Sequence, residues 1–228
     1  MARPRVLLTG FGPFPGIAEN PSAWLAETLA EQRPSPDFDG ELHATILPTE
    51  WEEIAALVPR LYESVQPHVM IHFGLSERAK AFRIERSAHN RAARRADARG
   101  AMPSGPVILP EGPDRFDTAL PASALAAHLK ACGLAAVTSR SAGRYLCNFL
   151  YYHSLDWARR RENACLVLFV HIPPASGRSS SFSEEALLHG AREIQRYVLT
   201  FASAHKHLKT TIGPAFARSG AILSAKEA

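Results

Sequence analysis

The stretch Cys165-Leu166-Val167-Leu168-Phe169-Val170-His171-Ile172-Pro173 decides the fold, because it is a continuous apolar run of strand length that stops at a proline. Such a run is typical of a buried strand. His171 falls at its carboxyl end, where a polar ring closing so apolar a strand indicates a functional role. The rest of the chain can be organised outward from this strand.

Similar apolar segments recur on both sides of that strand and alternate with helical patterns. The other predicted strands span residues 5–9, 41–47, 69–73, 81–84 and 135–139. Predicted helices span residues 21–29, 51–65, 121–132, 145–159 and 183–202. This alternation predicts a single α/β domain, a three-layer α/β/α sandwich around a twisted, mostly parallel mixed sheet. Open sheets of this kind place their sites at the carboxyl ends of the strands, where Gly10, Gly74 and His171 fall.

Two helix starts carry capping signals. Asn20 precedes Pro21 and is a candidate N-cap, and Thr49 with Glu52 matches a capping box ahead of the next helix. Between residues 90 and 120 the chain is rich in Arg, Gly and Pro, which predicts a long loop with at most short strands. The domain is expected over residues 1–203, and residues 204–228 are expected to form a loosely packed C-terminal tail.

Bulk properties exclude several classes of protein. The 228 residues carry a formal net charge of +4, with 46% hydrophobic and 21% charged residues, which is ordinary globular composition. A cluster of arginines lies at Arg91, Arg94, Arg95 and Arg99, but no aromatic side chains interleave it, so a solvated loop is favoured over a nucleic-acid surface. No apolar run is long enough to span a membrane. Three sparse cysteines favour a reducing compartment, and we expect a cytoplasmic protein without metal or disulfide.

Three side chains have the chemistry of a nucleophile, a base and a residue that orients the base. Cys147 follows a glycine turn at the start of a predicted helix, where unpaired backbone N–H groups and the helix dipole favour a thiolate. His171 supplies an imidazole and Glu85 a carboxylate. Two simpler explanations remain open at this point: Cys147 as a buried packing cysteine, and Glu85 as a solvated partner of the flanking arginines.

The glycine-rich turn after the first strand is a weak match to a dinucleotide site. Gly10 and Gly12 fit the first two glycines of that motif, but Pro15 occupies the third position. Phe11 and Phe14 on this proline-stiffened turn suit an apolar wall, the alternative being that both rings are core. His68 and His72 lack helical metal-ligand register and are interpreted as structural.

Together these segments resemble the pyroglutamyl peptidase I family of cysteine peptidases, also called pyrrolidone-carboxylate peptidases. The resemblance runs from about Arg5 to Leu199. It rests on eight pieces in the family's order, which are Thr9-Gly10-Phe11-Gly12-Pro13-Phe14 with Asn20-Pro21-Ser22, Leu47-Pro48-Thr49, His72-Phe73-Gly74-Leu75, Ile84-Glu85-Arg86 with His89-Asn90, Glu111-Gly112-Pro113, Ala119-Leu120-Pro121, Ser141-Ala142-Gly143-Arg144-Tyr145-Leu146-Cys147-Asn148, and Val170-His171-Ile172-Pro173.

The resemblance implies roles for particular residues. Cys147 would be the nucleophile, His171 the general base and acid, and Glu85 the residue that orients His171. Phe11 and Phe14 would surround a pyroglutamyl ring, with Asn20 near the pocket. The substrate would be a peptide with an N-terminal pyroglutamate, no cofactor would be needed, and the chain would assemble as a homodimer or homotetramer.

Some positions depart from the family pattern. Many bacterial members carry Gln and small glycines after the equivalent of Gly74, whereas this chain continues Leu75-Ser76-Glu77-Arg78-Ala79-Lys80, and Pro174 replaces a residue that is often aromatic. These departures keep two rival functions open. One is an amidase acting on a related cyclic amide, and the other is a catalytically silent binding protein on the same fold.

Overall fold

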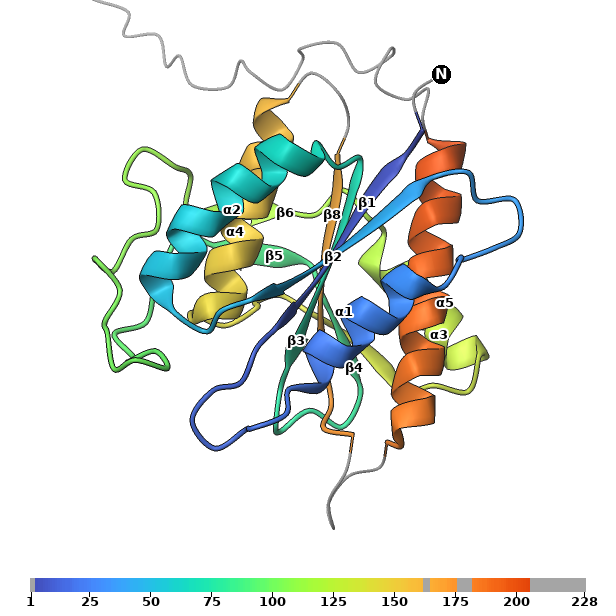
Figure 1. Cartoon of the computed structure of the whole chain (residues 1–228), viewed down its shortest axis with the longest axis horizontal. Coiled ribbons are helices and arrows are strands. Elements are labelled where there is room, and N and C mark those ends of the chain that lie inside the picture. Colours follow the sequence, from blue (N-terminus) through green and yellow to red (C-terminus); the bar gives the residue numbers. More distant parts are fainter. Residues whose placement is uncertain (1–2, 162–164, 176–181, 206–228) are drawn as a thin grey trace, which may run out of the picture.

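The protein is built around a single mixed sheet (Figure 1). A computed structural model describes residues 3–161, 165–175 and 182–205. Within them, six strands pair in the order β2-β1-β3-β8-β4-β7. Their bounds are β1 Arg5–Phe11, β2 Glu41–Leu47, β3 Val69–Leu75, β4 Phe82–Glu85, β7 Ala136–Ser139 and β8 Leu166–Ile172. The predicted α/β sandwich around a mostly parallel mixed sheet is confirmed.

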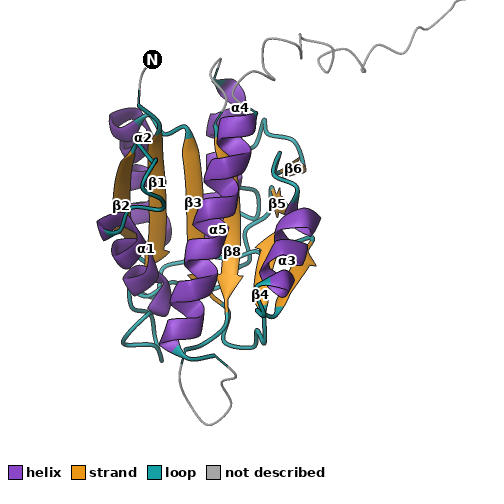
Figure 2. Ribbon diagram, turned by 90° about the vertical axis from the view of Figure 1, so that its right-hand side faces the viewer, coloured by secondary structure: helices purple, strands orange, loops and turns teal. Residues whose placement is uncertain are grey.

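Helices cover both faces of the sheet. Their bounds are α1 Pro21–Glu31, α2 Trp51–Val65, α3 Ala122–Ala131, α4 Leu146–Arg160 and α5 Glu184–Ala204. Helices α1, α3 and α5 lie on one face, and α2 and α4 lie on the other (Figures 1 and 2). Each face has its own buried apolar cluster, so the sheet separates two cores. Among the described residues, no helix combines the length and apolar composition needed to cross a membrane.

Strand β4 is the strand at which the direction of the sheet reverses, and together with β7 it makes the sheet mixed. It runs antiparallel to β8 and parallel to β7, whereas the pairs β1–β2, β1–β3 and β3–β8 are parallel. Beside it, β5 (Ser87–His89) and β6 (Arg115–Asp117) form a small antiparallel ribbon against α4. The sequence did not predict β5, because a three-residue strand carries too little alternation to be recognised.

The observed helix starts support one capping prediction and correct another. The Asn20 side chain accepts a hydrogen bond from the Ser22 N–H and caps α1 as expected. The capping box at Thr49 is wrong, because Thr49 Oγ1 instead donates to the Pro13 carbonyl at 2.6 Å. The carboxylate of Asp97, distant in sequence, accepts from the Trp51 N–H at 3.0 Å and caps α2 in its place.

Buried polar side chains anchor the long segment between β5 and β6. Asn90 accepts from the N–H groups of Ile108 and Leu109, and donates to the carbonyls of Leu109 and Gly112. Asn148 on α4 bonds both backbone groups of His89. A loop without regular structure is thus tied down by side chains that satisfy its backbone. The predicted tail lies outside the described residues except for its first two positions.

Candidate active site

The register of β4 against β8 brings Glu85 to His171. Arg83 pairs with His171 and Glu85 pairs with Phe169, so Glu85 lies diagonally from His171 on the same sheet face. The Glu85 Oε1 atom is 2.8 Å from His171 Nδ1. Glu85 is fully buried and the His171 side chain is 12% exposed, so the pair is largely shielded from solvent.

A glycine beside His171 makes room for the sulfur. Gly74 on β3 is the register partner of His171 on β8. A Cβ atom at Gly74 would lie 3.0 Å from Cys147 Sγ and 2.8 Å from the Phe169 ring. The half-buried Cys147 thiol, at the start of α4, therefore sits over a strand position that tolerates no side chain. It hydrogen-bonds the His171 ring, whose Nδ1 is already engaged with Glu85.

The electrostatics of the site favour a protonated imidazole. Burial alone would lower the pKa of His171, but the interactions with Cys147 and then with Glu85 outweigh it and raise that pKa to about 9. At neutral pH the ring therefore carries its proton, which is the state that pairs with a thiolate. The arrangement is that of a nucleophile, a proton donor and an orienting carboxylate in a row.

The start of α4 adds backbone donors to this row. The N-cap residue of α4, Tyr145, makes no side-chain hydrogen bond to the helix, and the first N–H groups of a helix, here including that of Cys147, have no partner within the helix itself. Such donors suit an oxygen that gains negative charge next to the sulfur.

Two further side chains contact Glu85: Arg83 at its carboxylate and Tyr151 at its backbone carbonyl. Arg83 Nε lies 3.6 Å from Glu85 Oε1, and its guanidinium also donates to Ser139 Oγ at 3.0 Å. The Tyr151 hydroxyl donates to the Glu85 backbone carbonyl at 3.0 Å. The sequence did not identify either residue, since their contribution depends on the β4 register and on the α4 face.

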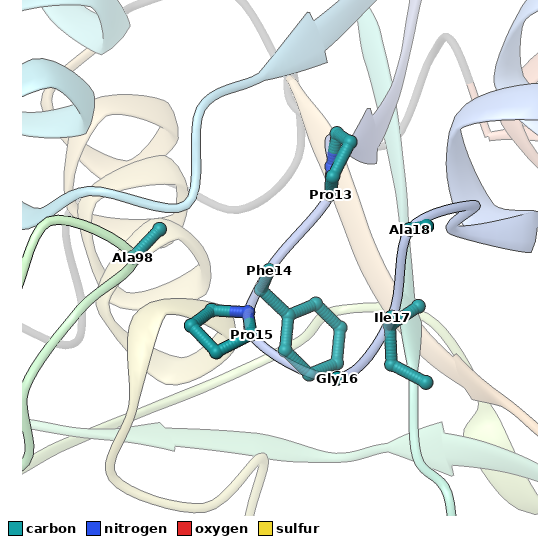
Figure 3. Close-up of a pocket in the computed structure, with 7 residues that line it drawn as sticks. All are labelled: Pro13, Phe14, Pro15, Gly16, Ile17, Ala18 and Ala98. Atoms are coloured by element: carbon teal, nitrogen blue, oxygen red, sulfur yellow. The ribbon is translucent and has the colours of Figure 1, made fainter.

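Phe14 lines a shallow hollow next to β1. The hollow has a volume of about 460 Å³ and is formed by residues 13–18 together with Ala98. Figure 3 shows the Phe14 ring between Pro15 and Ile17, with Ala98 facing this turn from the arginine-rich loop. An apolar hollow of this kind suits a small ring with methylene groups.

The other two predicted pocket residues lie deeper. Phe11 is 3% exposed and packs in the core cluster on the α2 and α4 face. Asn20 is 7% exposed, and its amide is engaged with Gly12 and Ser22. Asn20 thus fixes the turn that carries Phe14, and a direct role of Phe11 or Asn20 in binding stays a prediction.

The arginine-rich loop is attached beside the thiol. The Tyr145 hydroxyl donates to the Ala96 carbonyl at 3.0 Å, and the Arg95 guanidinium lies 4.6 Å from the centre of the Tyr145 ring. Trp51 packs edge-on against Tyr145 and donates its indole N–H to the Arg95 carbonyl. The loop that reaches the hollow through Ala98 is therefore anchored two residues before Cys147.

Comparison with known proteins assigns this chain to a family. The family model for pyroglutamyl peptidase matches residues 4–179, which include Glu85, Cys147 and His171. The chain belongs to the pyroglutamyl peptidase family.

Relatives of this peptidase family agree in sequence and in fold. Pyroglutamyl-peptidase 1 of Rattus norvegicus is 34% identical over 178 residues, covering 76% of this chain and 82% of that protein. Pyrrolidone-carboxylate peptidase of Clavibacter michiganensis is 35% identical over 171 residues, covering 75% and 78%. The solved pyrrolidone carboxyl peptidase of Thermococcus litoralis superposes with a TM-score of 0.81 at 25% identity, covering 88% of this chain and 96% of that one.

Proposed function

We propose that this protein is a cysteine peptidase that removes N-terminal pyroglutamate from peptides. The observation that carries the proposal is the row of Glu85, His171 and Cys147 near the carboxyl end of β8, in a chain of the pyroglutamyl peptidase family. The names of the relatives point to the substrate class, and the contacts among the three side chains support the mechanism described next.

In the first half of the reaction the Cys147 thiolate attacks the carbonyl carbon of the pyroglutamyl residue. A carbon–sulfur bond forms, and the carbonyl oxygen gains a negative charge that the backbone N–H groups at the start of α4 stabilise. The protonated His171 then donates its proton to the departing amine, the carbon–nitrogen bond breaks, and a thioester remains on Cys147.

In the second half the neutral His171 removes a proton from water. The hydroxide attacks the thioester carbon, the carbon–sulfur bond breaks, and pyroglutamate leaves with the thiolate restored. Glu85 keeps its charge throughout, fixes the ring by its bond to Nδ1 and stabilises the imidazolium. No step requires a metal or an organic cofactor.

The hollow beside Phe14 is the proposed site for the pyroglutamyl ring. The methylene groups of the ring would contact Phe14 and, as the family resemblance implies, Phe11, with Asn20 holding the turn that carries Phe14. The lactam N–H and C=O need partners within the pocket, because leaving either unpaired costs about 1–3 kcal/mol.

A fluorogenic pyroglutamyl amide tests the proposal. The wild-type chain should release the fluorophore, and the Cys147→Ser variant should lose nearly all of this activity while Cys165→Ser retains it. The His171→Ala variant should also be inactive. Cleavage that survives in Cys147→Ser would overturn the assignment of the nucleophile.

The same experiment separates the rival functions. Rapid alkylation of Cys147 by iodoacetamide without cleavage would indicate an amidase acting on a different cyclic amide. Slow alkylation without cleavage would indicate a binding protein on this fold.

Assembly and location are part of the proposal. A homodimer or homotetramer follows from the family resemblance, and light scattering of the full chain would measure its mass. A cytoplasmic location fits a nucleophile that must remain a reduced thiol, and the described chain contains three free cysteines.

A further inference from the structure

We propose that His128, Cys132 and Glu193 form a binding site for a zinc-like divalent cation that joins α3 to α5. The site lies on the sheet face opposite to Cys147 and is independent of the proposed peptidase activity. Nitrogen, sulfur and carboxylate oxygen are the three ligand types that zinc takes in proteins.

The fold brings the three side chains together from two helices. His128 lies in the last turns of α3 and Cys132 is its C-terminal cap residue, four positions later, so both lie on the same side of the helix. Glu193 comes from the middle of α5, which packs beside α3. The sequence did not indicate this site, because its third ligand is separated from the others by more than sixty residues.

The distances between the ligand atoms suit one ion. His128 Nε2 lies 3.0 Å from Glu193 Oε2, and Cys132 Sγ lies 3.8 Å from that oxygen and 3.9 Å from that nitrogen. A tetrahedral zinc ion, with bonds of about 2.3 Å to sulfur and about 2.0–2.2 Å to nitrogen and oxygen, holds such atoms about 3.4–3.6 Å apart. Shifts of a few tenths of an ångström therefore convert the observed triangle into a coordination shell.

The burial and orientation of Glu193 also suit a cation ligand at this position. The Glu193 side chain is 9% exposed, which makes it a poorly solvated carboxylate. Arg196 Nη1 bonds its other oxygen, Oε1, at 3.2 Å, and so orients the carboxylate while leaving Oε2 toward His128 and Cys132. The Tyr197 ring packs against the His128 ring, with centroids 5.4 Å apart, and limits its rotation.

Solvent has access to the fourth position of such a site. The His128 side chain is 36% exposed and Cys132 is half-buried, so a water molecule can complete the tetrahedron. The Cys132 thiol and the His128 Nε2 position must each be free of a proton to bind the ion, and these protons pass to the solvent. Three protein ligands and one water favour zinc or cobalt over magnesium, which prefers oxygen ligands.

The proposed ion would act as a cross-link within the fold. Helix α3 packs against β4 and β7, and α5 packs against β3 and against Phe82 of β4, whose ring approaches Gly190 closely. Joining the two helices would stabilise the side of the sheet that holds β4, and the stabilisation would rise with the concentration of free metal.

The test uses the full chain carrying Cys147→Ser, so that the thiol of the proposed active site cannot bind the probe. Titration with Co²⁺ should give the near-ultraviolet absorption of a thiolate–cobalt bond and the visible bands of tetrahedral cobalt, and Zn²⁺ should displace both. The melting temperature should rise with added Zn²⁺. Adding Cys132→Ser should abolish the near-ultraviolet band and the thermal shift.

Matched variants make the result specific. Cys165→Ser removes another half-buried cysteine and should leave the cobalt spectrum unchanged. His128→Gln, at a partly exposed position whose folding circular dichroism can verify, should weaken metal binding by more than about 100-fold, beyond the loss typical of an outer-shell change. Absence of the thiolate band in Cys147→Ser, its persistence after Cys132→Ser, or unchanged affinity in His128→Gln would each overturn the proposal.

Discussion

At the scale of single residues, the contact between Glu85 and His171 sets the charge of the proposed active site. Glu85 is fully buried, and its Oε2 atom has no hydrogen-bond partner among the described residues. Its charge is stabilised by the His171 ring and by Arg83 Nε at 3.6 Å. A buried carboxylate held in this way supports a protonated ring more effectively than an exposed one would.

The Glu85→Gln variant tests this charge. The amide can still hydrogen-bond the ring but carries no charge, so the pKa of His171 should fall from about 9. The alkaline limb of kcat/KM should move to lower pH, because the imidazolium loses its proton earlier. At neutral pH, kcat should fall by about 10²–10⁴-fold.

The control for this prediction is Glu53→Gln on the exposed face of α2. It should leave both the rate and its pH profile as in the wild type. An unchanged alkaline limb in Glu85→Gln would show that this carboxylate does not govern the charge of the ring.

At the scale of structural elements, Asp97 links the arginine-rich loop to the start of α2. Its carboxylate accepts from the N–H groups of Trp51, Arg99 and Ala101. Burial alone would raise the pKa of Asp97, but these three N–H groups, together with the charge of Arg99, lower it. The ionised carboxylate is therefore the form that the folded protein stabilises.

The Asp97→Ala variant should lose the cap and loosen the loop. We expect the free energy of unfolding to fall by about 1–2 kcal/mol, the upper part of the range for a lost N-cap. Because Ala98 lines the hollow, KM should rise more than kcat falls. Urea denaturation and steady-state kinetics measure the two effects.

The pH dependence of this difference has a definite sign. A carboxylate with a lowered pKa stabilises the fold above its ordinary pKa, and that contribution is lost as the pH falls through its pKa in the folded state. The difference in free energy of unfolding between the wild type and Asp97→Ala should therefore become smaller as the pH is lowered. Asp37→Ala, at an exposed position, serves as the control and should change neither stability nor KM.

At the scale of the whole molecule, the sequence predicts the order of elements far better than their contacts. The strand at Glu41–Leu47 and the helix at Trp51–Val65 were predicted with their observed bounds, because their periodicity is local. The reversed direction of β4 and the cap from Asp97 were not, since each depends on residues distant in the chain.

The candidate site likewise contains residues that the sequence identifies and features that only the structure reveals. Glu85, Cys147 and His171 were identifiable by residue type and by resemblance, and the structure brings them together. The close approach at Gly74 and the position of Arg83 follow from strand register, which no local pattern encodes.

His72, a buried residue of β3, should make the free energy of unfolding of the whole molecule depend on pH in the acid range. Its ring is fully buried, with Nδ1 2.8 Å from Thr9 Oγ1, and burial lowers its pKa to about 3. In the unfolded chain His72 is protonated as the pH falls below about 6.5, whereas in the folded protein it stays neutral down to about pH 3. Above pH 6.5 the neutral His72 therefore costs no stability. Below pH 6.5 the free energy of unfolding falls by at most about 1.4 kcal/mol per pH unit, because protonation of this ring favours the unfolded chain.

The His72→Asn variant keeps a polar group near Thr9 and removes the titrating ring. Urea denaturation at neutral pH and in mild acid should show a shallower loss of stability with acid than in the wild type. Replacing the exposed His189 by Asn should leave the wild-type slope unchanged. Equal slopes in His72→Asn and the wild type would contradict the prediction.

The alternation of side chains along β4 constrains how this protein can evolve. Sliding β4 by one position against β8 would replace the acid at Glu85 with Ile84 on that face, whereas changing the length of the segment between β3 and β4 need not move either strand. Insertions and deletions there are compatible with an intact contact between Glu85 and His171, whereas a shift of β4 by one residue in register is not. The connecting segment can therefore vary in length while the alternation along β4 keeps Glu85 on the same sheet face as His171.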